Sequence, residues 1–479
     1  MLSPLANQNV IKNPAAIFAL MTIAIFCAAF FSILTRPLSF MAIFWIPNAI
    51  LFGLLLRFPH FQKWYGWLGA IVGYLMADLV NGTNLALTFA LTTANLANVA
   101  TAVALIHASK LDYNRFNHGL TFFYLFILIA ISGFVGAVTA ITLVPNMPNT
   151  FMPDKNLGQE LVMWWTAEIQ NMIMLLPVIL TWPSLDTLKA TLHTQFQKIQ
   201  HNPRIALPLL VIILSTCMGY YFSGPGAMMF PVAGMLWAAL TYHFFTITLI
   251  NLVVCSALFF SVTQFYLGFS QHDYLDTTVS ARIGVFMMAL APLTVALISQ
   301  NRSNLFHQLQ HHVNYDALTQ AMSRRNFLDT TFKQLRLIRP KASPFALLMI
   351  DLDYFKKIND THGHHIGDVT LQHFVKVTQQ TLRQNDLFGR LGGEEFAIFL
   401  SEIQPTEALK VAQRIQENLE KSPLILSDQT ILTIRVSIGL FHHTQSNDNL
   451  EELLSYADQA LYKAKQLGRN QVYVAQPTS

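Results

Sequence analysis

The first three hundred residues of this chain form a succession of long apolar stretches, and this feature restricts the fold more than any other. Residues 15–35, for example, contain no charged side chain. A backbone inside a lipid bilayer must satisfy its own hydrogen bonds, and a helix of about 20 residues crosses the hydrocarbon core. We therefore predict an all-helical membrane domain with ten spans, at 15–35, 38–56, 64–80, 84–107, 119–144, 157–182, 205–222, 226–243, 246–268 and 278–299.

One boundary leaves a second count open. The apolar run around Tyr242–His243 is compatible with two helices or with one span and a re-entrant piece, so the chain has ten or eight spans. Composition favours a membrane domain under either count, because the chain is 53% hydrophobic and 12% charged and most of the charge follows Asn301. Cys27, Cys217 and Cys255 all lie in predicted spans, where we expect them to act as small packing residues.

The loops between the predicted spans differ in charge from one side to the other. Basic residues gather in alternate loops, a bias that is typical of the cytoplasmic side. The loops on that side would carry Lys12, then Arg57 and Lys63, then Lys110 and Arg115, then Lys189, Lys198 and Arg204; the opposite loops carry only Arg36, and Lys155 beside Asp154. An even number of spans then places the N-terminus and everything after residue 300 in the cytoplasm.

Two acidic residues interrupt the apolar spans, Asp78 and Glu168. A carboxylate in lipid costs at least a few kcal/mol, so both side chains should face the interior of the helical bundle. They indicate either a ligand or proton site, or a structural polar contact with Asn95, Asn98 or Asn171.

The last third of the chain has a different character. The octapeptide RLGGEEFA, residues 390–397, places two glycines and two adjacent carboxylates on a tight turn between short strands. Glycine permits a positive φ and a close approach by a ligand, and paired acids supply the hard oxygens that Mg²⁺ prefers. Upstream, an apolar strand ends in Asp351 and Asp353. Together these acids indicate a metal-dependent site for nucleotidyl transfer.

This region resembles the GGDEF-domain diguanylate cyclases, which join two GTP molecules into cyclic di-GMP. The resemblance rests on ordered motifs: DALTQAMSRR from Asp316, the acid Asp351, the run FKKIND, the pair Gly367–Asp368, the unbroken GGEEF, and LYKAKQLGRN near the C-terminus. It implies the palm-like fold of nucleotide cyclases and polymerases. The membrane block is more loosely similar to the membrane-associated sensor domains of the MASE group, through Trp45–Pro47, GYLMADLVNG around Asp78, and Trp164–Trp165 followed by Glu168.

The chain is accordingly divided into a multi-pass transmembrane sensor domain at 1–300, a signalling helix at 301–315 and a catalytic domain at 316–479. Leu305, Leu309 and Val313 recur at helical spacing in the signalling helix, which we expect to continue the last span and to pair briefly across a two-fold axis. In the catalytic domain, strands are predicted at 344–352, on both sides of GGEE and at 430–443, and helices at 361–383, 406–422 and 449–468. This alternation predicts an α+β fold with helices flanking one sheet.

The resemblance assigns roles to individual residues. It implies that Asp351, Glu394 and the Leu352 carbonyl bind Mg²⁺, with Mn²⁺ as an alternative, and that Glu395 binds a second metal ion. Glu394 would also act as the general base. Asn359 and Asp368 match the family's guanine-binding positions. Phe355 and Lys356, expected in a loop, and Lys465 and Arg469, expected on one face of the last helix, would contact substrate, with the lysines and the arginine handling phosphate. Arg383 and Asp386 of RQND match the family's inhibitory product site, with Arg414 as a candidate for its facing half.

The predicted protein is a membrane-bound, homodimeric diguanylate cyclase of a bacterial inner membrane. Its expected partners are GTP, cyclic di-GMP as product and allosteric ligand, and membrane lipid, and no nucleic acid is expected. The alternative is a catalytically silent receptor for cyclic di-GMP. A transporter regulated by the GGDEF domain is disfavoured, because the membrane block shows neither a clear internal repeat nor abundant mid-membrane charge.

Overall fold

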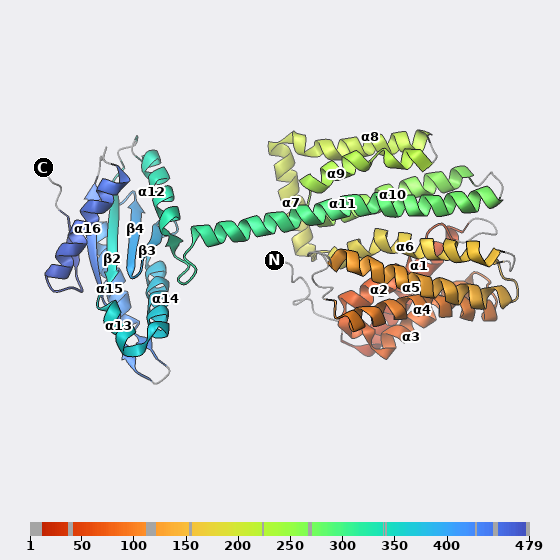
Figure 1. Ribbon diagram of the computed structural model, residues 1–479, viewed down its shortest axis with the longest axis horizontal. Coiled ribbons are helices and arrows are strands. Elements are labelled where there is room, and N and C mark those ends of the chain that lie inside the picture. The colour runs from red at the N-terminus through yellow and green to blue at the C-terminus, as the bar shows by residue number, and fades with distance from the viewer. Residues whose placement is uncertain are drawn as a thin grey trace. The chain divides into compact units, whose positions relative to one another are not determined.

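The computed structural model describes residues 12–36, 42–111, 121–152, 156–222, 225–266, 271–338, 340, 343–426, 429–443 and 449–475. By its internal contacts the chain divides into two compact units, Met1–Ser303 and Asn304–Ser479. The first is a bundle of helices, and the second is a mixed sheet flanked by helices (Figure 1).

Most helices of the first unit run roughly side by side as a bundle, and α7 lies across one end of it (Figure 1). They are α1 (Pro14–Leu34), α2 (Pro47–Arg57), α3 (Trp64–Val80), α4 (Leu85–Ser109), α5 (Thr121–Leu143), α6 (Leu157–Thr181), α7 (Leu185–His201), α8 (Leu207–Phe222), α9 (Val232–Thr241), α10 (Phe244–Tyr266) and α11 (Gln271–Asn314). Local chemistry sets several starts: Asn13 and Asn84 accept hydrogen bonds from the first turns of α1 and α4, and proline occupies the first position of α1 and α2.

Within the described residues, seven helices are long and apolar enough to cross a membrane. They include all or most of α1, α4, α5, α6, α8, α10 and α11. The other three predicted spans correspond to shorter apolar helices at Pro47–Arg57, Trp64–Val80 and Gly226–Thr241, so the count of ten stays a prediction. The apolar run breaks at Tyr242–His243 into the short α9 and the longer α10. Of these two only α10 is long enough by itself to cross a membrane, so two spans and one span with a re-entrant piece both stay open there.

One predicted span differs in its start. The span at 38–56 begins as a helix only at Pro47, because proline has no backbone N–H and starts helices readily; residues 37–41 lie outside the described part. The segment between spans that carries Lys189 forms the polar helix α7, which is not among the helices apolar enough to cross a membrane.

The outside of this bundle is apolar. On α1 and α5, side chains such as Leu20, Ile23, Ile127 and Ile131 are exposed, while other apolar residues of the same helices pack into one continuous core. A soluble protein would not present such surfaces over several neighbouring helices. The unit is therefore built as a multi-pass membrane domain.

Small residues bring α1 and α3 into close contact. A Cβ at Gly69 or Gly73 would clash with the backbone carbonyls of Phe18 and Thr22, respectively, on α1. The hydroxyl of Thr22 also donates to the Gly69 carbonyl across the interface, at 3.1 Å. This is the close packing that glycines spaced four apart permit between membrane helices.

The second unit contains a six-stranded sheet in the order β1-β3-β4-β2-β7-β8. Its strands are β1 (Met322–Ser323), β2 (Phe345–Leu352), β3 (Leu387–Gly392), β4 (Glu395–Ser401), β7 (Val436–His443) and β8 (Val472–Val474); β5 (Leu424–Ile425) and β6 (Ile431–Leu432) form a separate ribbon. The helices are α12 (Arg324–Ile338), α13 (Phe355–His362), α14 (His364–Thr381), α15 (Pro405–Lys421) and α16 (Leu450–Gln466). The predicted α+β fold is confirmed.

The central strand β2 is buried over its whole length and has helices on both faces. Ala346, Leu348 and Ile350 pack with residues of α14 and α15. The alternate residues Leu347 and Met349 pack with residues of α12 and α16. Because successive side chains of a strand point to opposite faces, one apolar run supplies two cores.

Three element predictions need correction. The FKKIND segment, expected as a loop, is helix α13. The strand expected at 430–443 is divided into β6 and β7, which belong to different sheets. The last helix ends at Gln466 rather than 468, because Gly468 takes a φ of 120° that no helix contains.

Candidate active site

The GGEE segment is a tight turn between β3 and β4. The pairing of the two strands shifts register between Arg390 and Gly392, and Gly393 takes a φ of 49°. A bulge of this kind re-aims the side chains that follow it. A residue other than glycine would be strained at Gly393, because the left-handed region brings Cβ too close to the backbone carbonyl.

Strand pairing brings the two acidic clusters of the sequence together. Asp351, near the end of β2, lies directly opposite Glu395, the first residue of β4. The Leu352 N–H donates to the Glu394 carbonyl at 3.4 Å. Acids that are forty-odd residues apart in the chain therefore meet at one edge of the sheet.

A lysine from the last helix completes this group. Lys465 Nζ lies 2.8 Å from Asp351 Oδ2, and Asp351 itself is buried. Burial raises the pKa of Asp351, the hydrogen bond and charge of Lys465 oppose the rise, and the nearby charges of Glu394 and Glu395 add to it. The ammonium of Lys465 thus pairs with one carboxyl group that has two further carboxyl groups nearby.

This donor set fits a divalent cation. The described residues contain no group of three His, Cys, Asp or Glu side chains arranged to hold a metal ion by themselves. The predicted set does not require one, since it combines the carboxylates of Asp351 and Glu394 with the Leu352 carbonyl. All of these ligands are hard oxygens, and the excess negative charge beside Lys465 favours a cation of charge two.

The second acid of the upstream cluster has a structural position. Asp353 accepts hydrogen bonds from the Ser437 hydroxyl at 2.8 Å and from the Asn470 N–H at 2.9 Å, and its own N–H donates to the Arg435 carbonyl. It therefore joins the end of β2 to the start of β7 and to the loop after α16. The sequence could not separate this role from that of Asp351, because both acids follow the same apolar strand.

The predicted guanine-binding pair lies at the junction of two helices. Asn359 is in the last turn of α13, and Asp368 is exposed in the first turns of α14. The Asn359 side chain sits directly over Gly367, so that a Cβ at Gly367 would overlap its Oδ1 atom. The amide and the carboxylate therefore come from adjoining positions of the fold.

The predicted phosphate-binding cations are placed in three different ways. Lys356 is exposed in the first turn of α13, behind the buried Phe355. Lys465 is paired with Asp351. Arg469 lies beyond the end of α16 with a φ of 64°, and its guanidinium stacks over the Tyr354 ring at 4.9 Å. The prediction that Lys465 and Arg469 share one helix face was wrong, because the helix ends before Gly468.

The RQND segment forms a turn after α14. Asp386 Oδ2 accepts from the Arg383 N–H at 2.8 Å, and the Arg383 side chain is exposed. Burial raises the pKa of Asp386, partly offset by that hydrogen bond and by the charges of Arg383 and Arg414. Arg414, on α15, donates to the Thr381 carbonyl at 2.8 Å. The three predicted product-site residues are thus neighbours in the fold.

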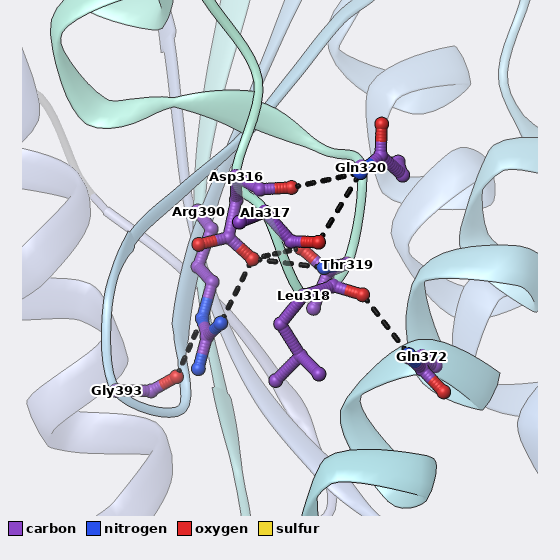
Figure 2. A network of polar contacts seen from close by, with 8 residues as sticks. All are labelled: Asp316, Ala317, Leu318, Thr319, Gln320, Gln372, Arg390 and Gly393. Atoms are coloured by element: carbon purple, nitrogen blue, oxygen red, sulfur yellow. Dashed lines mark hydrogen bonds and ion pairs between the residues drawn. The ribbon is translucent and has the colours of Figure 1, made fainter. Parts of the chain in front are cut away.

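A network that the sequence analysis missed links the GGEE turn to the start of the catalytic unit (Figure 2). Arg390 donates to the Gly393 carbonyl and to Asp316 Oδ1, both at 2.9 Å. The same Asp316 oxygen accepts from the hydroxyl and the N–H of Thr319, and Gln372 of α14 donates to the Leu318 carbonyl. The sequence analysis recognised the motif at Asp316 and the GGEE motif separately. The only sign in the sequence that they meet is the opposite charge of Asp316 and Arg390.

Comparison with known proteins agrees with this geometry. A family model described as "Diguanylate cyclase, GGDEF domain" matches residues 313–471, and one described as "MASE1" matches residues 15–302. "Probable diguanylate cyclase DgcF" of Escherichia coli O157:H7 is 26% identical over 474 residues, which are 96% of this chain and 94% of the relative. "Diguanylate cyclase DosC" of Escherichia coli strain K12 is 38% identical over 181 residues, which are 37% of this chain and 39% of the relative.

Among solved structures, the GGDEF domain of DgcB from Caulobacter crescentus, in complex with c-di-GMP, is similar to the second unit. It shares 27% identity at a TM-score of 0.33 and covers 34% of this chain and 93% of that domain. GGDEF diguanylate cyclases as a family use a divalent metal ion, in keeping with the oxygen ligands described above. Since the MASE1 match spans more than half of the sequence and the GGDEF match nearly all of the rest, this chain belongs to the MASE1 family of membrane proteins and carries a GGDEF diguanylate cyclase domain.

Proposed function

We propose that this protein is a membrane-bound diguanylate cyclase that condenses two GTP molecules into cyclic di-GMP and two pyrophosphates. The observation that carries the proposal is the pairing of β2 with β4, which sets Asp351 opposite Glu395 and beside Glu394. Carboxylates this close together repel one another, which costs free energy. A receptor that only bound cyclic di-GMP would gain nothing from this arrangement.

The reaction forms two bonds and breaks two. In each half, the 3′-oxygen of one GTP bonds to the α-phosphorus of the other, the bond from that phosphorus to the pyrophosphate oxygen breaks, and the 3′-hydroxyl loses its proton. Bound Mg²⁺, held by Asp351, Glu394 and the Leu352 carbonyl, would neutralise the charge that develops on the phosphate. Glu394 is the base proposed to accept the proton, and Glu395 the ligand proposed for a second ion.

The cations around the turn would bind phosphate. Lys465 is paired with Asp351, which would hold the metal ion, and its ammonium would bind a phosphate oxygen of the substrate. Lys356 and Arg469 flank the same end of β2, at the start of α13 and after α16. Asn359 and Asp368 would read guanine, whose N1–H and N2–H donors suit a carboxylate and whose O6 suits an amide N–H.

Two copies of the chain are needed, because the reaction joins two GTP molecules and the second unit offers one such turn. The helix α11 continues without a break into the second unit, to Asn314. Leu305 and Val313, two residues of the predicted stripe, are exposed there, with 59% and 56% of their surfaces accessible; the side chain of Leu309 lies outside the described part. An exposed apolar stripe on a helix supports pairing with a second copy.

The proposed setting is the inner membrane of a bacterium, with the N-terminus and the catalytic unit in the cytoplasm, where GTP is available. The basic residues of alternate loops support this orientation. The lipid contacts would be made by the apolar outer faces of the bundle.

The decisive experiment measures cyclic di-GMP formed from GTP by the purified full-length protein in lipid nanodiscs. Asp351→Asn and Glu394→Gln should each lower the rate by a factor of about 10³ or more, since each removes a carboxylate proposed to hold the metal ion, whose positive charge would stabilise the transition state. Glu407→Gln, an exposed change of the same type on α15, is the matched control and should keep the parental rate. A parent that binds cyclic di-GMP but makes none, or acid variants that work at the parental rate, would refute the proposal.

A further inference from the structure

The membrane unit contains a buried polar cluster that the cyclase reaction does not use. Asp78 on α3 and Glu168 on α6 are 3% and 2% exposed, which confirms that both face the bundle interior. Glu168 Oε1 accepts from Asn48 Nδ2 at 2.7 Å, and Asn48 also donates to Asn95 Oδ1 at 3.0 Å. Glu168 thus bonds to Asn48 on the short helix α2, which the sequence analysis did not consider, and it also interacts with Asn98 on α4, one of the predicted partners.

A pocket opens beside this cluster. The described residues that line it are Arg36, Ala42, Trp45, Leu91, Asn95, Phe151, Trp164, Ala167 and Glu168. About 450 Å³ of empty space lies among these residues, and this figure includes open solvent. It lies at the end of the bundle where α1 ends and α6 begins, and its walls are largely aromatic and aliphatic. Ligand sites are commonly apolar pockets of this kind with a few convergent polar groups.

Three polar atoms of the pocket lining are buried without a hydrogen-bond partner among the described residues. They are Glu168 Oε2, Trp164 Nε1 and Arg36 Nε. A buried polar atom without a partner costs about 1–3 kcal/mol, and more when it is charged. Three such atoms in one pocket indicate that a bound molecule supplies the missing partners.

The chemistry of these atoms defines the molecule. Glu168 Oε2 accepts hydrogen bonds, whereas Arg36 Nε and Trp164 Nε1 donate them. Stacking over the Phe151 ring, 5.0 Å from its centre, holds the Arg36 guanidinium in place. A simple amine would satisfy only Glu168, and a simple carboxylate only Arg36 and Trp164.

We propose that this pocket binds a small zwitterion of the free α-amino-acid class. Its ammonium group bonds to Glu168, its carboxylate to Arg36 and the Trp164 N–H, and its apolar side chain lies between the aromatic walls. Such a ligand has no net charge. Its ammonium group would pair with Glu168 and its carboxylate with Arg36, so binding would leave no charge of the ligand unpaired.

The pocket is physically connected to α11. Arg282 on α11 is 2% exposed and donates to the carbonyls of Met163, at 2.6 Å, and Ala42, at 3.4 Å. Ala42 lines the pocket, and Met163 precedes Trp164, which lines it too. A ligand that shifts either backbone segment therefore acts on the helix that ends at Asn314. An effect of the ligand on catalysis rests on the proposed cyclase function, whereas binding of the ligand to the pocket does not.

The test is calorimetric titration of the full-length protein in lipid nanodiscs, without GTP, using L-leucine, L-methionine and L-phenylalanine. The matched probes are 3-methylbutylamine and 4-methylpentanoate, which keep the shape of leucine but lack its carboxylate or its ammonium group. We expect at least one amino acid to bind and the single-charge probes to bind about tenfold or more weakly. Absence of saturable binding by all three amino acids at millimolar concentrations would overturn the proposal and would leave a pocket that holds only water.

Variants locate the site. Glu168→Gln and Arg36→Gln should each weaken binding about tenfold or more. Glu160→Gln, earlier on α6, and Arg204→Gln, before α8, are controls outside the pocket lining and should bind like the parent. Ala167→Leu fills the pocket without changing a charge and should abolish binding in a folded protein. Equal affinity in the parent and the pocket variants would refute the site. The cyclase assay, run separately, shows whether bound amino acid changes the rate.

Discussion

At the scale of single residues, the candidate site depends on close contacts more than on residue type alone. Asn359 is held against the backbone of Gly367, which puts its amide beside Asp368. Asp351 is held by Lys465. Each contact fixes a side chain that substrate would otherwise have to order, and ordering a side chain costs binding free energy.

Gly367→Ala should raise the KM for GTP by about tenfold, the equivalent of one hydrogen bond to guanine, because the new Cβ displaces the Asn359 amide. The measurement is initial rate against GTP concentration. Gly158→Ala is the control, since a Cβ there would meet no atom within 4 Å. An unchanged KM in a folded Gly367→Ala variant would argue against Asn359 as a guanine ligand.

Arg383→Ala should keep the initial rate but continue synthesis at product concentrations that stop the parent. Its exposed guanidinium offers a planar fork for guanine and phosphate and belongs to the turn before β3, whereas GGEE is the turn after it. The measurement is the initial rate of parent and variant at increasing concentrations of added cyclic di-GMP. Arg325→Ala removes another exposed arginine of the same unit, which pairs only weakly with Asp329, and should be inhibited like the parent. Identical inhibition of the Arg383 variant would show that RQND is only a turn.

At the scale of elements, the end of α11 is tied to the catalytic turn by a chain of hydrogen bonds. Ser323 Oγ and Asn326 Nδ2 donate to the carbonyls of Val313 and Asn314, which are the last residues of α11. The turn that follows carries Asp316, and Arg390 joins it to the GGEE turn. Hydrogen bonds therefore connect the end of α11 to the GGEE turn, and a rotation of α11 would act on the active site through them.

Asp316→Asn should lower the free energy of unfolding of fragment 304–479 by about 1–2 kcal/mol near neutral pH. Burial tends to raise the pKa of Asp316, but the hydrogen bonds from Thr319 and Arg390 and the Arg390 charge outweigh it, so the pKa lies below its usual value. A depressed carboxyl pKa stabilises the fold above the unfolded-state pKa of about 4, and this contribution is lost as the pH falls further.

The difference between parent and variant, measured by urea unfolding, should therefore shrink between about pH 5 and pH 3. Asp329→Asn, at an exposed ion pair on α12, serves as the control and should change stability little at any pH. A difference for Asp316→Asn that stays constant across this range would exclude the ionised carboxylate as its cause.

At the scale of the whole molecule, the two units have separate cores. The second unit buries apolar residues on both faces of β2 without any contribution from the helices of the bundle. It should therefore fold by itself. The membrane unit and α11 would hold two copies of the chain together.

Deleting residues 1–300 should consequently make the rate per molecule depend on protein concentration, because two domains must meet for each product formed. Fusing the shortened chain to a dimeric coiled coil in place of the membrane unit should restore the rate at low concentration. The measurement is specific activity over a dilution series. A constant specific activity in the unfused fragment would contradict the two-site arrangement.

The sequence alone determined the class of each unit. Uncharged apolar stretches of membrane-spanning length need no tertiary information to be recognised, because the bilayer imposes the same requirement on every helix that crosses it. The strands around GGEE and the helix of α15 were likewise predicted within one or two residues, since their apolar periodicity is local. The ends of helices were harder to predict from the sequence. Gly468 follows a polar helical pattern, and the sequence does not show that its φ is 120° and that the helix ends before it.

Only the tertiary structure decided which distant residues meet. Arg390 reaches Asp316 across 74 positions, and Asn48 reaches Glu168 across 120. Contacts of this kind depend on strand register and on how helices pack, so a one-residue shift would separate the partners while leaving every local pattern intact. The sequence therefore determines which chemical groups the chain carries, and packing determines which of them form a site.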